Sequence, residues 1–550
     1  MWPDKHGSPA CTRFAWIPPI RWRPATHSRT RGLRWSESRV FLWFFGNRLQ
    51  ESSMTRRYDL WIDGQWQAAS TPESVARYSP AHGDKLAEYA AGSVADLDRA
   101  VGAARARFDD QSWSRLPGAT RAALLNAWAA LIERDTEKLA RIEAEEVGKP
   151  IRFARAEIAA SVDLTRYAAS LAWQLGGDAF SNLGADKLGL VTREARGVVG
   201  MIVPWNFPLV TLFQKLPFAL AAGCTTVIKP SELTSGTALE VAALAKEAGI
   251  PAGVINVVTG TGPIVGEAMS KHPGVDMVSF TGSTLVGKQI ARNAAETVKH
   301  VALELGGKAA NVVFADADLD AALDGVLLGT ILNQGEECVA GTRLLIEESV
   351  ADAFVSKLVE RAKRVVVGLP LDDRSDIGAL IHEQHLNKVL DYIRIGKEEG
   401  ATLAVGGERV TANGLDKGFF VGTTIFTGVT PEMRIFREEI FGPVLTVTTF
   451  KDVDEAVRLA NDTNYGLGNG LWTKDIDKAI TVSQQLRSGT VFVNTYLESA
   501  PQMPFGGFKE SGVGRENGLD GLLEYTEVKS TFIKLGKRTP ALPATVVDAG

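Results

Sequence analysis

From Gly197 onward, short β-rich apolar runs alternate with longer stretches in which apolar residues recur at helical spacing. The strands predicted here are 197–203, 225–229, 254–258 and 277–280, and the predicted helices are 209–222, 235–248, 263–271 and 283–295. Alternation of this kind predicts parallel strands with helices on both faces. Ligands of such sheets bind beyond the carboxyl ends of the strands, so functional residues are expected there.

A second alternating block runs from about residue 309 to 493, and 411–450 is its less regular part. Upstream of both blocks, helical periodicity predicts helices over 94–109, 119–146 and 154–172. The segment 178–198 has a Gly/Asn-rich start followed by alternation and predicts an extended hairpin. A final strand is predicted over 523–532, after a glycine-rich loop. The fold class is therefore α/β, with two alternating units and a small β extension.

Length and composition narrow the protein class. With 550 residues the chain is too long for one core, and 45% hydrophobic and 23% charged residues are ordinary for a globular protein. The net charge of −5 argues against nucleic acid as a partner. Three cysteines cannot build a disulfide framework, which favours a reducing compartment, and we expect the cytoplasm. No apolar run reaches the roughly 20 residues that span a membrane.

The first 53 residues have a different composition. They contain nine of the Lys and Arg residues, three acids and five of the twelve tryptophans. An Arg-rich, acid-poor leader is typical of a transit peptide, but we expect residues 1–53 to be a disordered leader. The fold is expected to begin after Met54, at the strand-like run 58–64.

Cys338 is the candidate nucleophile. It lies in the glycine-flanked segment 333–343, after a long helical pattern, whereas Cys224 lies between an Ala-rich helix and a strand and is expected to be buried and inert. A lone cysteine is usually a small buried hydrophobe. Its proposed partners elsewhere in the chain, Asn206 and Glu304, favour a thiolate that attacks a carbonyl.

The run 279–289 is a glycine-rich turn between a predicted strand and a predicted helix, which is the setting for a phosphate. A nucleoside-triphosphate loop would need Ser or Thr after Lys288, and Gln289 has no hydroxyl for magnesium. A dinucleotide site with unusual glycine spacing and a purely structural turn stay open. No Cys pair has ligand spacing, and His382 and His385 lack the spacing of a zinc-protease helix, so no metal is expected.

Three further turns carry polar candidates. Asn206 lies between two prolines, which fix the backbone and suit an amide aimed at an oxyanion, although such an Asn also bonds its own turn. The run 229–232 ends a strand, and its Lys and Glu suit ribose hydroxyls or a solvated loop. Glu304 precedes two glycines and would be a general base if burial raised its pKa, or else a surface acid.

In this order the motifs resemble the aldehyde dehydrogenase superfamily, over roughly Tyr58 to Lys534. The segments that carry the resemblance are those around Asn206, 229–232, 280–283, 304–308, Cys338, 438–443, 504–507 and 525–529.

The resemblance implies that Cys338 is the nucleophile and Glu304 the general base of the hydrolytic branch. It also implies that Asn206 and the Cys338 N–H form the oxyanion hole, and that Lys215 lies near the proton path. The cofactor is expected to be NAD, with NADP as an alternative. The residues implied for cofactor binding are Ile202, Val203, Pro204, Trp205, Lys229, Ser231, Glu232, Gly262, Phe280, Thr281, Gly282, Ser283, Gly287, Leu305, Glu439 and Phe441.

The resemblance further implies a Rossmann-like NAD-binding domain over 54–177 and 196–304 and a catalytic domain over 305–522. Strands in 178–195 and 523–540 would bridge subunits of a homodimer or homotetramer. The function expected is oxidation of an aldehyde to a carboxylic acid through a thiohemiacetal and a thioester. The alternative is a non-catalytic binding or structural protein with this fold. Two acids expected at the site mouth, Glu337 and Glu498, favour an amino- or betaine-type aldehyde, and an aliphatic aldehyde is equally compatible.

Overall fold

The computed structural model describes residues 55–537, and the predicted leader lies outside them. Within this range the strands form four sheets, two large and two of three strands each. The first large sheet has the order β20-β12-β11-β8-β9-β10-β2-β3. Its strands are β20 (Gly512–Val513), β12 (His300–Glu304), β11 (Met277–Thr281), β8 (Val198–Ile202), β9 (Thr225–Lys229), β10 (Ile255–Val257), β2 (Leu60–Ile62) and β3 (Gln65–Gln67).

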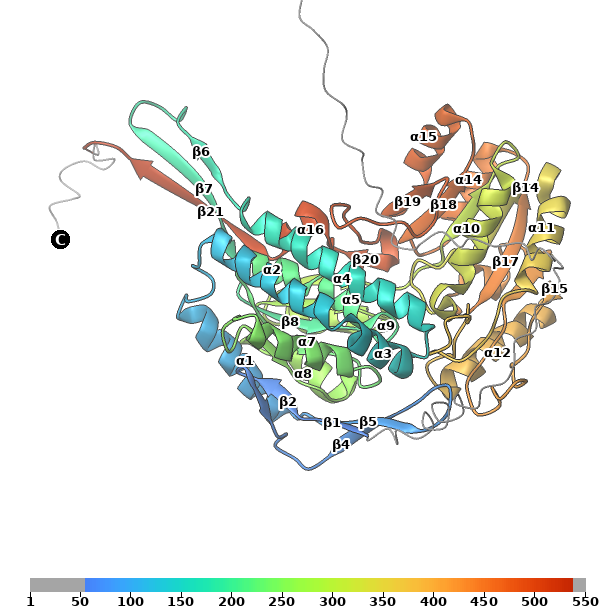
Figure 1. The fold of residues 1–550 in the computed structure, drawn as a ribbon. Coiled ribbons are helices and arrows are strands. Elements are labelled where there is room, and N and C mark those ends of the chain that lie inside the picture. The colour runs from blue at the N-terminus through green and yellow to red at the C-terminus, as the bar shows by residue number, and fades with distance from the viewer. Residues whose placement is uncertain (1–54, 538–550) are drawn as a thin grey trace, which may run out of the picture.

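Helices cover this sheet, as the predicted alternation requires (Figure 1). They are α1 (Val94–Asp109), α2 (Gly118–Arg134), α3 (Thr136–Val147), α4 (Ile151–Ala172), α5 (Pro208–Phe213), α6 (Leu216–Ala222), α7 (Gly236–Glu247), the π-turn η1 (Gly262–Gly266), α8 (Glu267–Lys271) and α9 (Thr284–Ala295). The predicted helix 119–146 is wrong as a single element, because the chain turns at Asp135 between α2 and α3.

The predicted helix 209–222 is likewise two helices, and the reason is Pro217. Proline has no N–H to give to the carbonyl one turn earlier, and its ring crowds that carbonyl. The helix therefore ends at Phe213, and Lys215 lies at the break with φ −114° and ψ −60°. Lys215 at this break is completely buried.

The second large sheet has the order β15-β16-β17-β14-β13-β18-β19. Its strands are β15 (Thr402–Val405), β16 (Thr424–Thr427), β17 (Val444–Phe450), β14 (Arg343–Glu347), β13 (Ala310–Val313), β18 (Gly468–Trp472) and β19 (Thr490–Val493). Its helical elements are α10 (Leu319–Ile331), η2 (Leu332–Gly335), α11 (Glu348–Ala362), α12 (Glu383–Glu398), α13 (Arg434–Arg437), α14 (Val453–Asn461) and α15 (Ile476–Gln485). Only β15 runs antiparallel to its neighbour.

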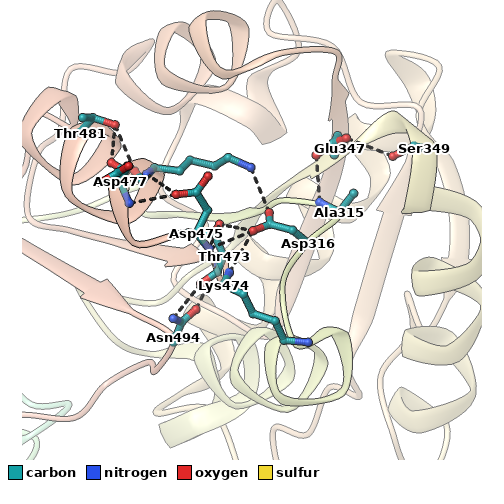
Figure 2. Close-up of polar contacts among 11 residues, drawn as sticks. Ala315, Asp316, Glu347, Ser349, Thr473, Lys474, Asp475, Asp477, Thr481 and Asn494 are labelled. Carbon is teal, nitrogen blue, oxygen red and sulfur yellow. Dashed lines mark hydrogen bonds and ion pairs between the residues drawn. The ribbon is translucent and has the colours of Figure 1, made fainter.

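Asp316 stabilises the carboxyl end of β13 (Figure 2). Its carboxylate accepts hydrogen bonds from the Thr473 hydroxyl at 2.6 Å and from the backbone N–H groups of Lys474 and Asp475 at 3.0 and 3.1 Å. Lys478 Nζ lies 3.0 Å from the other carboxylate oxygen. These bonds lower the pKa of Asp316 to about 2 against the opposing effect of burial. One carboxylate thus joins β13 to the turn between β18 and α15.

The predicted hairpin forms β6 (Asp178–Phe180) and β7 (Lys187–Ala195), and β7 pairs antiparallel with β21 (Thr526–Lys534) along its whole length. Figure 1 shows these three strands projecting from the body of the molecule. The predicted start of the last strand at 523 is wrong, because α16 (Gly518–Glu524) occupies those residues. The remaining sheet comprises β1 (Arg56–Tyr58), β5 (Lys85–Ala90) and β4 (Ser74–Tyr78).

The α/β fold class is confirmed. One short strand, β20, lies inside the range predicted for the catalytic domain, yet it pairs antiparallel with β12 at the edge of the first sheet. The domain boundaries themselves stay a prediction. No helix in the described part of the chain is both long and apolar enough to cross a membrane.

Candidate active site

The predicted cofactor residues lie in register at the carboxyl edge of the first sheet. Ile202, the last residue of β8, pairs with Lys229 of β9 and with Phe280 of β11. Thr281, one residue further along β11, pairs with Glu304 of β12. Because these strands are adjacent and parallel, their ends form one continuous row, as the alternating pattern predicted.

Lys229 and Glu232 form a pair at this edge. Lys229 is buried, and its Nζ donates to the Pro230 carbonyl at 2.7 Å and lies 3.4 Å from a carboxylate oxygen of Glu232. Burial lowers the pKa of Lys229 and the Glu232 carboxylate opposes that shift. Ser231 bonds its own turn, its hydroxyl accepting from the Leu233 N–H at 3.3 Å.

The glycines of the β11–α9 turn have packing reasons of their own. A Cβ at Gly287 would overlap the Leu305 side chain, and a Cβ at Gly282 would press on the Phe280 ring. Ser283 caps α9, its hydroxyl accepting from Val286 N–H. Gly262, the third glycine predicted to bind the cofactor, lies in η1, and an added Cβ there would meet nothing within 4 Å. Packing therefore explains Gly282 and Gly287 but not Gly262, and the contacts of all three with a phosphate stay a prediction.

The short segment 305–309 connects this edge to the amino edge of the second sheet, where β13 begins. Its glycines permit close approach of two other loops. Gly307 donates its N–H to Glu439 at 2.9 Å, and a Cβ at Gly307 would overlap the carbonyl oxygen of Cys338. A Cβ at Gly306 would meet the Glu439 carboxylate at 2.6 Å. Glu304, Cys338 and Glu439 are thus brought together from three distant stretches of sequence.

The turn before Cys338 has an unusual backbone. Asn333 and Gln334 both have left-handed conformations, with φ of 49° and 60°. Each such residue costs on the order of 1 kcal/mol or more and persists only where its surroundings impose it. The Asn333 amide supplies part of that restraint, since it donates to the carbonyls of Asn206 and Glu336 at 2.9 and 3.0 Å.

Asn206 is buried and directed at the same turn. Its side-chain N–H donates to the Glu336 carbonyl at 2.9 Å, two residues before Cys338. A side-chain amide has two N–H donors. The second N–H of Asn206 therefore remains as a donor for another acceptor.

Buried carboxyl groups surround the Cys338 thiol. Burial raises the pKa of the thiol well above its ordinary value, and the carboxylates of Glu337, Glu439 and Glu304 raise it further. Burial also raises the pKa of Glu304 to about 8, against the opposing effects of Lys215 and Arg515. A thiol in these surroundings needs a base to become nucleophilic, and Glu304 is poised near neutrality to be that base.

Lys215 is completely buried and forms an ion pair with Glu516, which is also buried. Burial lowers the pKa of Lys215, while Glu304 and Cys338 oppose that shift. Glu516 was not predicted from the sequence. It lies in the glycine-rich segment before α16, and the Gly514–Arg515–Glu516 triplet offers no local signal that its acid is buried.

A second buried cluster was also missed. Lys149, between α3 and α4, pairs with Glu157 and lies 3.4 Å from Glu143, with its Nζ 4.3 Å from the centre of the Phe207 ring. Burial raises the pKa of Glu337 to about 8, Lys149 opposes this and Glu157 adds to it. The cluster therefore reaches the residue next to the nucleophile.

Cys224 is fully buried, and its thiol donates to the Tyr525 carbonyl at 3.3 Å. Burial raises the pKa of this thiol to about 11. Together, the polar residues at the strand ends, the partly buried Cys338 near the Asn206 amide's acceptor and the buried Glu304 carboxyl with a pKa of about 8 are the features of an α/β enzyme that performs covalent chemistry on a carbonyl.

Comparison with known proteins gives the family. The model of the aldehyde dehydrogenase family matches residues 66–531. Aldehyde dehydrogenase 1A1 of Rattus norvegicus is 46% identical over 484 residues, covering 87% of this chain and 95% of the relative. Betaine aldehyde dehydrogenase of Bacillus subtilis (strain 168) is 43% identical over 473 residues, covering 86% and 96%.

Among solved structures, an NAD-dependent aldehyde dehydrogenase from Sinorhizobium meliloti superposes with a TM-score of 0.87 at 46% identity, covering 89% of this chain and 97% of that one. The chain belongs to the aldehyde dehydrogenase family. The predicted family and the predicted enzyme class, an oxidoreductase that acts on aldehydes, are thereby confirmed.

Proposed function

We propose that this chain oxidises an aldehyde to a carboxylic acid with NAD, using Cys338 as nucleophile, Glu304 as general base and Asn206 as oxyanion donor. The assignment is supported by two observations: the Asn206 amide bonds the Glu336 carbonyl two residues before Cys338, and the buried Glu304 carboxyl is close enough to raise the pKa of the Cys338 thiol. Of the two cysteines in residues 55–537, Cys338 is the more suitable nucleophile, since Cys224 is buried and its thiol donates to the Tyr525 carbonyl.

In the first step the Cys338 sulfur attacks the carbonyl carbon, and the thiol proton passes to Glu304. The carbonyl oxygen gains negative charge and accepts the second N–H of Asn206 together with the backbone N–H of Cys338. Donors fixed in this way stabilise charge that develops in the transition state, and loss of one costs on the order of 10²-fold or more in rate.

NAD, when bound, would supply the hydride acceptor that allows the thiohemiacetal to be oxidised to a thioester. Once Glu304 has released the thiol proton, its carboxylate takes a proton from water, whose oxygen attacks the thioester and releases the acid and the Cys338 thiolate. Lys215 and Glu516 offer a buried pair through which the Glu304 proton can leave. A charged pair of this kind is maintained in the interior only because each partner compensates the other.

The residues present fit a dinucleotide. The Thr281 hydroxyl lies buried at the strand edge with no hydrogen-bond partner among residues 55–537. Ile264 on η1 and Val286 on α9, the elements that follow β10 and β11, are both about half exposed, and such apolar side chains suit a flat ring. In this proposal Lys229 and Glu232 bind the adenosine ribose, and Glu439 and Phe441 hold the nicotinamide side.

Glu232 also favours NAD over NADP, because its carboxylate would repel a 2′-phosphate. Its side chain is about one-third exposed at the strand edge and therefore accessible to a ligand. Comparable catalytic efficiency with the two cofactors would contradict this preference.

For the substrate, we propose an aldehyde with a cationic group. One carboxylate oxygen of Glu337 is buried without a hydrogen-bond partner in the described part of the chain, directly beside Cys338. A cation near it would favour its ionised form. Glu498 is exposed, and in this proposal it lies at the rim of the substrate entrance.

We further propose a cytoplasmic homodimer or homotetramer that pairs through β6, β7 and β21, on which Phe180, Val528 and Phe532 are exposed.

NADH production across a panel of aldehydes tests the proposed function. Amino- and trimethylammonio-aldehydes are compared with neutral aldehydes of equal length and with aromatic and carboxy aldehydes. Wild-type protein should form NADH and Cys338→Ala should not. No NADH with any aldehyde would contradict the function, and equal rates with cationic and neutral aldehydes would contradict the substrate class.

A further inference from the structure

The turn 439–441 is assigned above to the nicotinamide side of the site. Two side chains of helix α12 form hydrogen bonds with its backbone. His385 Nε2 lies 2.7 Å from the Phe441 carbonyl oxygen, and Lys388 Nζ lies 3.3 Å from the Glu439 carbonyl oxygen. His385 and Lys388 are three residues apart and so share one face of α12. Since a carbonyl oxygen can only accept, His385 carries its proton on Nε2 and donates it to Phe441.

The backbone that His385 holds is strained. Phe441 has φ +63°, a left-handed conformation that is a genuine outlier for a bulky residue. Such a conformation is unfavourable for a residue with a large side chain and persists only where its neighbours impose it. The hydrogen bond from His385 acts on the carbonyl of that same residue, so it restrains the strained peptide directly.

His385 also contacts the other two loops of the site. The Trp205 ring packs edge-on against both the His385 ring at 5.6 Å and the Phe441 ring at 5.5 Å, and Trp205 immediately precedes Asn206. A carboxylate oxygen of Glu336 lies 3.5 Å from His385 Nε2, two residues before Cys338. On the far side, a Cβ at Gly335 would overlap the backbone of Gly442.

We propose that His385 is a positioning residue that holds the strained Phe441 turn in place against Trp205 and the Cys338 segment. This inference rests on the proposed function for its effect on NAD, although the restraint itself belongs to the protein alone. The neighbouring groups keep the imidazole neutral. Burial lowers the pKa of His385 to about 4, and Lys388 and His382 act in the same direction.

His382, the other half of the motif considered for zinc, has a separate role. Its Nδ1 accepts the backbone N–H of His385 at 3.0 Å and caps the amino end of α12. His382 thus caps the start of α12, and His385 joins the helix to the Phe441 turn. These two contacts explain the spacing of the two histidines without a metal.

Two variants separate the hydrogen bond from the packing. His385→Phe keeps a flat ring against Trp205 and removes the donor, whereas His385→Gln keeps a donor and removes the ring. Tyr392→Phe is the matched control, because Tyr392 lies on the same face of α12 but donates to the Glu438 side chain at 2.6 Å and not to the 439–441 backbone.

The first measurement is hydrogen–deuterium exchange of the peptide containing residues 438–444 in protein without cofactor. His385→Phe should exchange about tenfold faster in this peptide, with His385→Gln in between and Tyr392→Phe close to wild type. Equal protection in wild type and His385→Phe would overturn the proposal. If His385→Phe does not fold, the same comparison is made with His385→Leu, which also removes the donor.

The second measurement is NAD binding by titration calorimetry alongside steady-state kinetics. His385→Phe should raise the dissociation constant and KM for NAD about tenfold and change KM for the aldehyde less than twofold. An unchanged NAD affinity in His385→Phe overturns the functional part of the inference. A wild-type protein that neither binds NAD nor oxidises aldehydes would instead contradict the proposed function, while the exchange result would still decide whether His385 restrains the turn.

Discussion

The side-chain amide of Asn206 donates to the carbonyl of Glu336 at 2.9 Å, two residues before Cys338, which fixes one of its N–H groups and leaves the second N–H as a further donor. The two residues are 130 positions apart in sequence and belong to loops of different sheets. The Asn333 amide reinforces the contact by bonding both the Asn206 and the Glu336 carbonyls. The proposed oxyanion donor, Asn206, is therefore held by the same turn that carries the proposed nucleophile, Cys338.

This relationship predicts a specific loss when the amide is removed. Asn206→Ala should lower kcat with a neutral aldehyde by about 10²–10³-fold, because one preorganised donor to the oxyanion is lost. The dissociation constant for NAD should change little, since the Lys229–Glu232 pair is untouched. A fall in NAD affinity equal to the fall in kcat would show that Asn206 acts on cofactor binding and not on the oxyanion.

Glu304 should impose the pH dependence of the rate. Burial raises its pKa to about 8, and a general base works only when ionised, so kcat should rise as the pH increases from 6 through about 8 and then level off. Glu304→Gln should lower the rate and flatten this limb, and Glu304→Asp, which keeps a shortened carboxylate, should retain part of it. An unchanged profile in Glu304→Gln would exclude Glu304 as the base.

Lys149 should be required for stability. It is the cation shared by Glu143 and Glu157 in a site with almost no exposure. Lys149→Met leaves both carboxyl groups buried without their counterion and should cost about 3–5 kcal/mol, measured by urea unfolding. Adding Glu157→Leu should recover part of that loss. A Lys149→Met protein as stable as wild type would show that the carboxyl groups are already neutral.

Asp316 should contribute stability that is lost in acid. Its pKa is about 2 in the folded protein and about 4 when unfolded, so the contribution is complete above pH 4 and disappears as the pH falls towards 2. The side chain is 35% exposed, which reduces the contribution to about 1–2 kcal/mol. Asp316→Asn should lower the free energy of unfolding by that amount at pH 7 and by little at pH 2. An equal loss at both pH values would point to packing instead of charge.

Much of the first sheet could be predicted because buried parallel strands are continuous apolar runs, and helices between them have their own period. The positions of Lys229 and Thr281 at strand ends followed from that pattern, as register pairs then showed. Strand β12, which ends at Glu304, was not predicted, and Glu304 was expected in a glycine-rich turn. The helix break at Lys215 did not follow, because periodicity continues across Pro217 and only the missing N–H interrupts it.

The buried ion pairs were harder to predict, since a charged residue gives no local sign that it is buried. Glu516 and Lys149 each acquire their partners from elements far away in sequence. The role of His385 was hidden for the same reason, because its acceptor is a backbone carbonyl 56 residues later. Such contacts depend on tertiary packing and have no period in the sequence.

The central claim is that Cys338 carries the acyl group and that Glu304 governs its release. The most direct measurement is mass spectrometry of Glu304→Gln quenched during turnover with an aldehyde and NAD, with Cys338→Ala/Glu304→Gln as the control. We expect an adduct on the peptide containing Cys338, equal in mass to the acyl group, and none in the control. An adduct on Cys224, or no adduct while NADH forms in a single-turnover burst, would contradict it.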